Sequence, residues 1–173
     1  MRDRMAVPCI GAGLFFILAR FASIPGPVAG SELSLQVPFL AFLAALYGPA
    51  AGLLTGLAGQ ALTDLAGGGF VISRLLSIGL YGLLSGLLRD RLRLENGEFS
   101  GGDILRFNLF QLAGHAAVWF LADPCLKILL EQRPVNEAFL QGLACGISHM
   151  ITTALVGTVL CLIWKTSRPG KER

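Results

Sequence analysis

Charged residues are scarce in this sequence. Of its 173 residues, 14% are Asp, Glu, Lys or Arg, and none of these lies between Glu32 and Asp64. Soluble domains carry about 25% charged residues, and a charge-free stretch of this length is typical of membrane-spanning helices. Together with a hydrophobic content of 54%, this scarcity excludes a water-soluble enzyme, a disordered chain and a disulfide-rich secreted domain.

Motifs for metal, redox and nucleotide chemistry are also missing. The four cysteines form no CxxC pair, so neither a zinc site nor a redox pair is predicted. The sequence contains no HExxH, no GxxxxGK[ST] and no GxSG of the rhomboid-like proteases. We therefore expect no catalytic residue, no metal and no cofactor, and an ATP-driven step would need another subunit. A net charge of +3 is more typical of the basic rim of a membrane protein than of a nucleic-acid partner.

Long apolar runs predict an all-α integral membrane protein with a compact bundle of six transmembrane helices. Gly48-Pro49 divides a run that is too long for one crossing of about 30 Å of hydrocarbon. Pro25 ends the first helix, and Asp123-Pro124 ends the fifth. A charged loop is expected at 89–103, and it remains open whether the short second helix crosses fully. One membrane domain over 1–173 is predicted, with helices at about 5–24, 35–47, 49–66, 71–88, 104–122 and 137–164.

The basic residues predict the orientation. With a cytoplasmic N-terminus, ten of the 14 basic residues fall on the inner side and four on the outer side, namely Arg20, Arg74, Lys127 and Arg133. Because loops on the cytoplasmic side are enriched in Lys and Arg, both termini are expected in the cytoplasm of a multi-pass cell-membrane protein.

Small residues recur at a spacing of four. Gly48, Gly52 and Gly56 form two GxxxG units, and the pairs Gly82–Gly86 and Gly142–Gly146 repeat the spacing. Residues four apart share one helical face, so each unit predicts a groove against another helix. A similar groove at Cys9–Gly13 is a candidate contact for the helix of a partner protein.

Polar residues in the apolar helices are the candidates for function, because they are costly in a bilayer. Asn108, Gln111, His115 and Trp119 share one face of the fifth helix, and Gln141, Cys145, Ser148, His149 and Thr152 share one face of the sixth. Gln60 and Asp64 end the third helix, Arg74 begins the fourth, and the loop 25–36 can close over them. The candidate substrate-binding residues are Gln36, Gln60, Asp64, Arg74, His115, Trp119, Gln141 and His149.

An aromatic ring, amides and a few ionisable groups around an apolar cavity suit a small heteroaromatic or polar metabolite. Three structural alternatives stay open. Asp64 and Arg74 can simply pair with each other, Trp119 can be an interfacial belt residue, and the two histidines can hydrogen-bond between helices.

Several segments resemble the substrate-binding S components of energy-coupling factor (ECF) vitamin transporters, especially the riboflavin-type family that includes the UPF0397 proteins. The similar segments are RFASIP at 20–25, VPFLAFLAA at 37–45, LYGPAAGLLTGLAG at 46–59, ALTD at 61–64 and DILRFNLFQ at 103–111. The resemblance continues through Gly97, Phe99, Trp119 and Gln141-Gly142, and it covers nearly the whole chain.

The resemblance implies a six-helix membrane protein that captures a vitamin near the outer surface and has no catalysis of its own. It also implies partners, namely a membrane coupling protein (the T component) and two ATPase subunits. Family members often place small residues of the first helix against the coupling protein, and here Cys9, Ala12 and Gly13 occupy that place. Riboflavin is the first candidate substrate, while other vitamins or a thiamine precursor stay open. The alternative functions are a structural or assembly protein that binds partner helices and a self-sufficient carrier.

Overall fold

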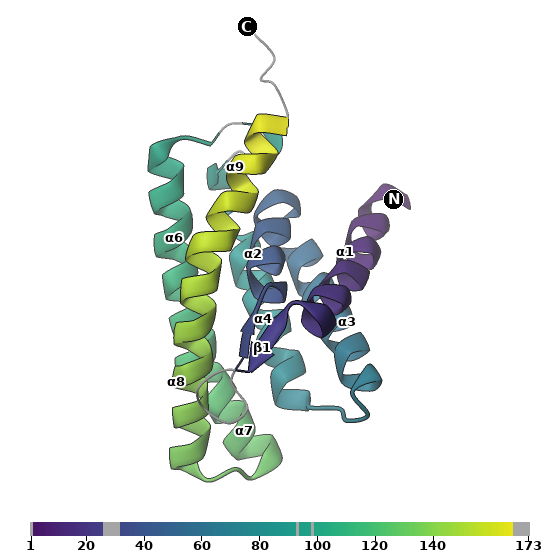
Figure 1. The fold of residues 1–173 in the computed structure, drawn as a ribbon, viewed down its shortest axis with the longest axis vertical. Helices are drawn as coiled ribbons and strands as arrows, with labels where there is room; N and C mark the ends of the chain where they lie inside the picture. The colour runs from purple at the N-terminus through teal and green to yellow at the C-terminus, as the bar shows by residue number, and fades with distance from the viewer. Residues whose placement is uncertain (1, 26–31, 93, 98, 168–173) are drawn as a thin grey trace, which may run out of the picture.

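In the computed structural model, residues 2–25, 32–92, 94–97 and 99–167 are described. Part of the loop 25–36, the basic residue Arg93 and the basic residues after Ser167 lie outside this range. The first half of the chain contains a long helix, a two-stranded hairpin and three further helices (Figure 1). These are α1 (Arg2–Phe21), β1 (Ser23–Pro25), β2 (Glu32–Ser34), α2 (Gln36–Tyr47), α3 (Pro49–Ala66) and α4 (Ile72–Gly86).

The second half begins with short helical turns and then forms two long antiparallel helices, each interrupted by a π-helical segment. The short turns are α5 (Arg89–Leu92) and the 3-10 helix η1 (Leu94–Asn96). The two long helices comprise α6 (Gly101–His115), η2 (Ala116–Ala122) and α7 (Asp123–Glu131), then α8 (Val135–Thr152), η3 (Thr153–Gly157) and α9 (Thr158–Ser167).

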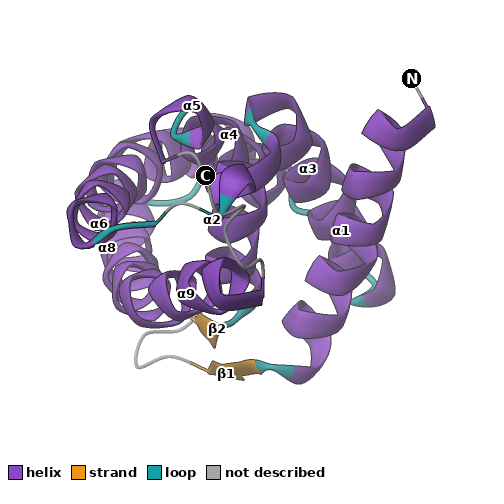
Figure 2. Cartoon of the chain, turned by 90° about the horizontal axis from the view of Figure 1, so that it is seen from above, coloured by secondary structure: helices purple, strands orange, loops and turns teal. Residues whose placement is uncertain are grey.

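The prediction of a helical membrane protein is confirmed. Among the described residues, three helices are long and apolar enough to cross a membrane: Ile72–Leu92, Gly101–Glu131 and Val135–Ser167. Two shorter apolar helices, Ala6–Phe21 and Gln36–Tyr47, accompany them, and α3 adds a further 18 residues. Six helical segments therefore fit a membrane bundle. Figure 2 shows α1 at one side of the bundle, with α6 and α8 at the other.

The predicted end of the fifth helix at Asp123-Pro124 is wrong. The helix continues as α7 to Glu131, because the preceding segment winds as a π-helix, in which the N–H of Asp123 bonds the carbonyl of Val118. Local π geometry lets a membrane helix accommodate a proline that has no N–H of its own. Asp123 and Lys127, assigned to the helix end and the following loop, are therefore buried helical residues.

Two smaller differences concern connecting segments. The hairpin pairs Ser23 with Ser34 and Pro25 with Glu32 in antiparallel register, so a short strand lies where the end of the first helix, about 5–24, and the start of a loop were expected. In addition, the predicted loop 89–103 contains α5 and η1, and α6 already begins at Gly101. Ser100 caps that helix in a capping box with Asp103.

The GxxxG spacing was correctly interpreted as helix packing. A Cβ atom on Gly52 would lie 2.1 Å from the carbonyl oxygen of Gly82, and one on Gly82 would lie 2.3 Å from that of Gly52. Gly86 meets the backbone of Pro49 in the same way. α3 and α4 therefore touch backbone to backbone. Gly48, with φ of +94°, makes the predicted break between α2 and α3.

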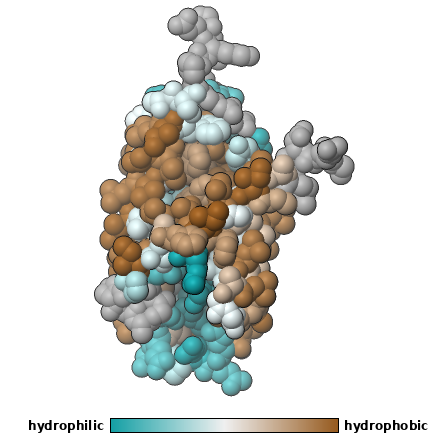
Figure 3. All heavy atoms as spheres, turned by 45° about the vertical axis from the view of Figure 1, so that its right-hand side comes forward, coloured by the Kyte–Doolittle hydropathy of each residue, from teal (hydrophilic) through white to brown (hydrophobic). Residues whose placement is uncertain are grey.

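The hydrophobic surface is typical of a lipid-facing bundle. Large apolar side chains are exposed along the long helices, for example Leu105, Leu109 and Leu121 on α6–η2 and Ile147 and Leu155 on α8–η3. In Figure 3 the hydrophobic surface forms a broad band, while hydrophilic atoms gather at the end that holds α7. A hydrophilic column rises from that end into the band, so polar groups penetrate the bundle there.

Candidate ligand-binding cavity

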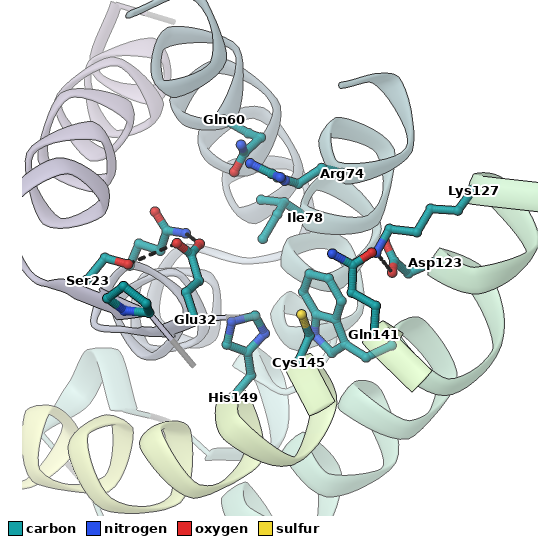
Figure 4. Close-up of a pocket in the computed structure, with 13 residues that line it drawn as sticks. Ser23, Glu32, Gln60, Arg74, Ile78, Asp123, Lys127, Gln141, Cys145 and His149 are labelled. Carbon is teal, nitrogen blue, oxygen red and sulfur yellow. Dashed lines mark hydrogen bonds and ion pairs between the residues drawn. The ribbon is translucent and has the colours of Figure 1, made fainter. Parts of the chain in front are cut away.

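A cavity of about 340 Å³ opens at the end of the bundle where the hairpin, α3, α4, α7 and α8 meet (Figure 4). It is lined by thirteen residues, which come from these elements and from α2 and η2. Segments far apart in the chain therefore contribute to one site. The lining residues are Ser23, Pro25, Glu32, Gln36, Gln60, Arg74, Ile78, Trp119, Asp123, Lys127, Gln141, Cys145 and His149.

The hairpin and the start of α2 form one wall. Glu32 accepts a hydrogen bond from Ser23 Oγ at 2.9 Å across the hairpin and another from Gln36 Nε2 at 3.1 Å. These bonds tie β1, β2 and the first turn of α2 together. Gln36 itself is buried, and its Oε1 has no hydrogen-bond partner among the described residues.

The end of α3 and the start of α4 form the opposite wall. Gln60 Nε2 donates to Asp64 Oδ1 at 2.7 Å, and the backbone N–H of Val71 donates to Asp64 Oδ2 at 3.1 Å. Arg74 completes the cluster with an ion pair of 3.9 Å to Asp64. Asp64 is buried and contributes to the site by holding Gln60 and Arg74, which face the cavity (Figure 4).

The third wall carries the rings. Trp119 on η2 and His149 on α8 are both 3% exposed, and their ring centroids lie 4.7 Å apart with an interplanar angle of 62°. Trp119 Nε1 and both ring nitrogens of His149 have no hydrogen-bond partner in the described part of the chain. Such buried, unpartnered polar atoms are uncommon in a folded protein and call for an explanation.

Two glycines of α8 bring this wall together. A Cβ on Gly142 would lie 2.4 Å from the carbonyl oxygen of Trp119, and one on Gly146 would lie 2.4 Å from the ring of Phe120 and 3.0 Å from Cβ of Trp119. The pair Gly142–Gly146 therefore lets α8 approach η2 closely enough to fix the position of the tryptophan.

A buried ion pair closes the remaining side. Lys127 Nζ lies 2.7 Å from Asp123 Oδ2, and Ser77 Oγ donates to Asp123 Oδ1 at 3.1 Å. Nearby, Ser73 on α4 donates to Glu131 at the end of α7. α4 and α7 are thus joined by two polar contacts, and the charge of Asp123 is balanced inside the bundle.

His115 lies beneath the cavity. Its Nε2 hydrogen-bonds the hydroxyls of Tyr81 at 2.9 Å and Thr153 at 3.1 Å, and its ring stacks on Tyr81 at 4.4 Å. Tyr81 donates in turn to Gln111 Oε1 at 2.8 Å, which also accepts from Ser85 Oγ at 3.0 Å. These five residues form a hydrogen-bonded central network that joins α4, α6 and η3.

The predicted polar residues gather as expected, with two exceptions. Six of the eight candidates line the cavity, whereas Asp64 lies behind Gln60 and His115 lies in the central network. Sequence reasoning missed Asp123 and Lys127 as lining residues, because Pro124 was interpreted as a helix end. It also missed Ser23 and Ile78, which no pattern in the sequence distinguishes. The face shared by Gln141, Cys145 and His149 already indicated Cys145.

The predicted partner-contact residues of α1 lie on different sides of the helix. Cys9 is exposed, and a Cβ on Gly13 would meet nothing within 4 Å. Ala12, by contrast, is buried within the bundle. Ile10, Ile17 and other large apolar side chains of α1 are also exposed. The outward surface of α1 near Cys9 and Gly13 is therefore open to lipid or to another helix.

Comparison of the sequence with known proteins finds a matching family model and several relatives. The family model described as "ECF-type riboflavin transporter, S component" matches residues 2–166. A "UPF0397 protein" of Enterococcus faecalis is 34% identical over 99% of this chain and 97% of its own length.

Further relatives carry the same name. One from Clostridium perfringens is 38% identical over 94% of this chain and 88% of its own length. One from Streptococcus pneumoniae is 39% identical over 90% of this chain and 85% of its own length. No solved structure matches the chain.

Proposed function

Because the chain belongs to the family of ECF-type riboflavin transporter S components, we propose that it captures a small vitamin-like metabolite in this cavity. The family makes the chain a membrane-embedded transport subunit and not an enzyme. The proposal adds which residues bind the substrate, on which side of the membrane they do so, and where the energy for transport comes from.

One observation carries the binding proposal. Trp119 and His149 lie side by side on the cavity wall, almost fully buried, with their polar ring atoms unpartnered. A ring-shaped ligand can stack on the indole and supply those hydrogen bonds, which removes the penalty of burying bare polar atoms. A volume of about 340 Å³ is at the small end of ligand pockets, which span roughly 300–1,000 Å³, and it suits a compact metabolite.

Riboflavin is the first substrate to test, because the matching family is described by that vitamin. Other vitamins and a thiamine precursor are the alternatives. The substrate reaches the cavity from outside the cell if the orientation predicted by the basic residues is correct. In that orientation the cavity is at the outer face and Gly97 is at the inner face.

Cysteine labelling tests this orientation. In a variant without native cysteines, an impermeant reagent added outside intact cells is expected to modify a cysteine at Gly68 or Gln132 and not one at Gly97. Gly68 follows α3 and Gln132 follows α7, both near the cavity end, whereas Gly97 follows η1 at the opposite end. Labelling of Gly97→Cys from outside would reverse the orientation and place the cavity at the cytoplasmic face.

Energy for uptake comes from partners in this proposal, since the sequence has no nucleotide-binding motif. A membrane coupling protein and two ATPase subunits supply it. The exposed surface of α1 around Cys9 and Gly13 is the proposed contact for the coupling protein, because small residues allow a partner helix to approach closely. Purified protein is then expected to bind its substrate without ATP and to hydrolyse none.

The decisive experiment is native mass spectrometry of the purified protein, followed by titration of the ligand that it carries. A bound vitamin-like compound, lost on heating and restored by riboflavin or another vitamin, supports the proposal. Concentrative uptake by the chain alone in liposomes would show a self-sufficient carrier instead. Absence of any ligand, with no binding of the vitamins tested, would favour a structural or assembly protein.

A further inference from the structure

We propose that the cavity selects a flat nitrogen heterocycle whose edge presents N–H donors, such as an amino-substituted ring, because two carboxylates fix two glutamine amides with their carbonyl oxygens free. This inference rests on the proposed function, since it names the ligand class of the same cavity. It also assigns Asp64 a positioning role, although this residue does not line the cavity.

Asp64 determines how the amide of Gln60 is oriented. The carboxylate accepts hydrogen bonds from Gln60 Nε2 and the N–H of Val71, and it forms an ion pair of 3.9 Å with the guanidinium of Arg74. An ionised carboxylate only accepts hydrogen bonds, so the nitrogen of Gln60 must face it. The carbonyl oxygen of Gln60 is therefore the atom left over. It is buried and has no partner among the described residues.

Glu32 does the same for Gln36. One oxygen of Glu32 accepts from Gln36 Nε2 and the other from Ser23 Oγ. The carbonyl oxygen of Gln36 is again buried without a partner in the described part of the chain. Both glutamines line the cavity, although their carbonyl oxygens are themselves covered, so we assign the missing donors to a ligand that reaches these oxygens from the cavity. Two glutamine oxygens that accept from one ligand require two N–H groups on that ligand.

The ring wall adds a complementary requirement. The indole N–H of Trp119 is donor only, and a neutral His149 offers one donor and one acceptor. An amino group next to an unprotonated ring nitrogen presents a donor and an acceptor side by side. The amino group can donate to the glutamine oxygens, and the ring nitrogen can accept from a donor of the ring wall. Stacking on Trp119 then orients the ring.

The cations of the cavity disfavour an anionic ligand. Lys127 is paired with Asp123 at 2.7 Å, and Arg74 is paired with Asp64. A carboxylate or phosphate on the ligand would have to compete with these acids. Riboflavin itself presents one ring N–H between two carbonyl oxygens, so its ring edge matches the two glutamine oxygens less well than an amino-substituted ring does.

A matched pair of small probes tests the inference. 4-Aminopyrimidine and pyrimidin-4-one have similar shapes. The first carries an amino group beside an unprotonated ring nitrogen, and the second carries a carbonyl oxygen beside a ring N–H. Titration of the full-length protein in detergent is expected to give at least about tenfold tighter binding of 4-aminopyrimidine, equivalent to about 1.4 kcal/mol. Riboflavin is titrated in parallel.

Asp64→Asn is the informative variant. An asparagine at 64 can donate to Gln60, which allows the amide to turn and present its nitrogen to the cavity. The preference for 4-aminopyrimidine is then expected to fall at least threefold, whereas Asp103→Asn, at the opposite end of the bundle, is expected to leave it unchanged. If Asp64→Asn does not fold, Glu32→Gln tests the same idea on the other glutamine.

The outcomes separate the inference from the function. Equal or tighter binding of pyrimidin-4-one overturns the inference, and so does an unchanged preference in the folded Asp64→Asn or Glu32→Gln variant. Binding of riboflavin with no binding of either pyrimidine also overturns it and leaves the proposed function standing. If the protein binds neither riboflavin nor either pyrimidine and no ligand co-purifies with it, the proposed function fails and the inference fails with it.

Discussion

Two groups of buried polar side chains meet within the bundle and differ in whether their hydrogen bonds reach another helix. In the central network, Tyr81, Gln111 and His115 each bond another helix through at least one atom, although Gln111 Nε2 and His115 Nδ1 have no hydrogen-bond partner among the described residues. In the cavity group, Trp119 and His149 make no hydrogen bond through their rings to the described residues. Within the same part of the chain, the side chains of Gln36 and Gln60 bond only the carboxylates beside them.

The difference teaches how to separate structural from ligand-binding polar residues in a membrane bundle. Gln111, His115 and Trp119 share one helical face, and their spacing does not distinguish them. Their partners do, because hydroxyl groups of α4 and η3 reach Gln111 and His115, while Trp119 faces the cavity. The two groups meet where the rings of His115 and His149 lie 6.2 Å apart.

The largest expected effect is on ligand affinity in Trp119→Ala. Removing the indole deletes the stacking surface, which is worth roughly 1–3 kcal/mol when desolvated, or about a five- to 140-fold loss of affinity. The measurement is a titration of the co-purified ligand or of riboflavin, after melting curves confirm that the variant is folded. An affinity equal to that of the parent would make Trp119 a belt residue and remove it from the cavity group.

Gln111→Ala is expected to lower stability instead. It leaves the hydroxyls of Tyr81 and Ser85 without their shared acceptor, at a cost of about 1–3 kcal/mol in the free energy of unfolding. Ligand affinity should change less than about twofold. Denaturation in detergent, with the exposed Asn136→Ala as a control, measures the loss. A larger drop in affinity than in Trp119→Ala would exchange the roles of the two groups.

The smallest effect is expected from Tyr81→Phe. The ring keeps its stacking on His115, and only the hydroxyl that joins Gln111 to His115 is removed, so about 1 kcal/mol of stability is lost. In a double-mutant cycle with Gln111→Ala, the two losses are expected to be clearly non-additive. Full additivity would show that the two side chains do not act through one hydrogen bond.

The sequence predicted the bundle and much of the cavity lining. Apolar runs and the Gly48-Pro49 break placed the helices, because membrane helices need about 20 apolar residues. The positions of Gln60 and Arg74 at adjoining helix ends, and of Trp119 and His149 on polar faces, correctly brought these four residues to one place.

What the sequence did not predict depends on local geometry that a regular 3.6-residue period does not contain. The π turn at η2 carries the helix through Pro124 and buries Asp123 and Lys127 in the cavity wall. The depth of His115 likewise depends on which hydroxyl groups of neighbouring helices reach it, and helical spacing alone does not give that. The orientation of the glutamine amides is set by Glu32 and Asp64, each four residues away in the chain. The spacing brings Gln60 and Asp64 together on one helix, but it does not tell which amide atom stays free of a partner.

The shortness of α2 has a consequence for how the protein enters the membrane. Its 12 residues span about 18 Å at 1.5 Å per residue, well short of about 30 Å of hydrocarbon. Nine of them are buried against the rest of the bundle, so the helix depends on protein contacts that do not exist while the chain is being synthesised. We expect residues 36–66 to insert into the membrane as one helical hairpin. In that case α2 enters together with α3, after translation has passed Gly48. The order of synthesis, and not only the final packing, then constrains this part of the chain.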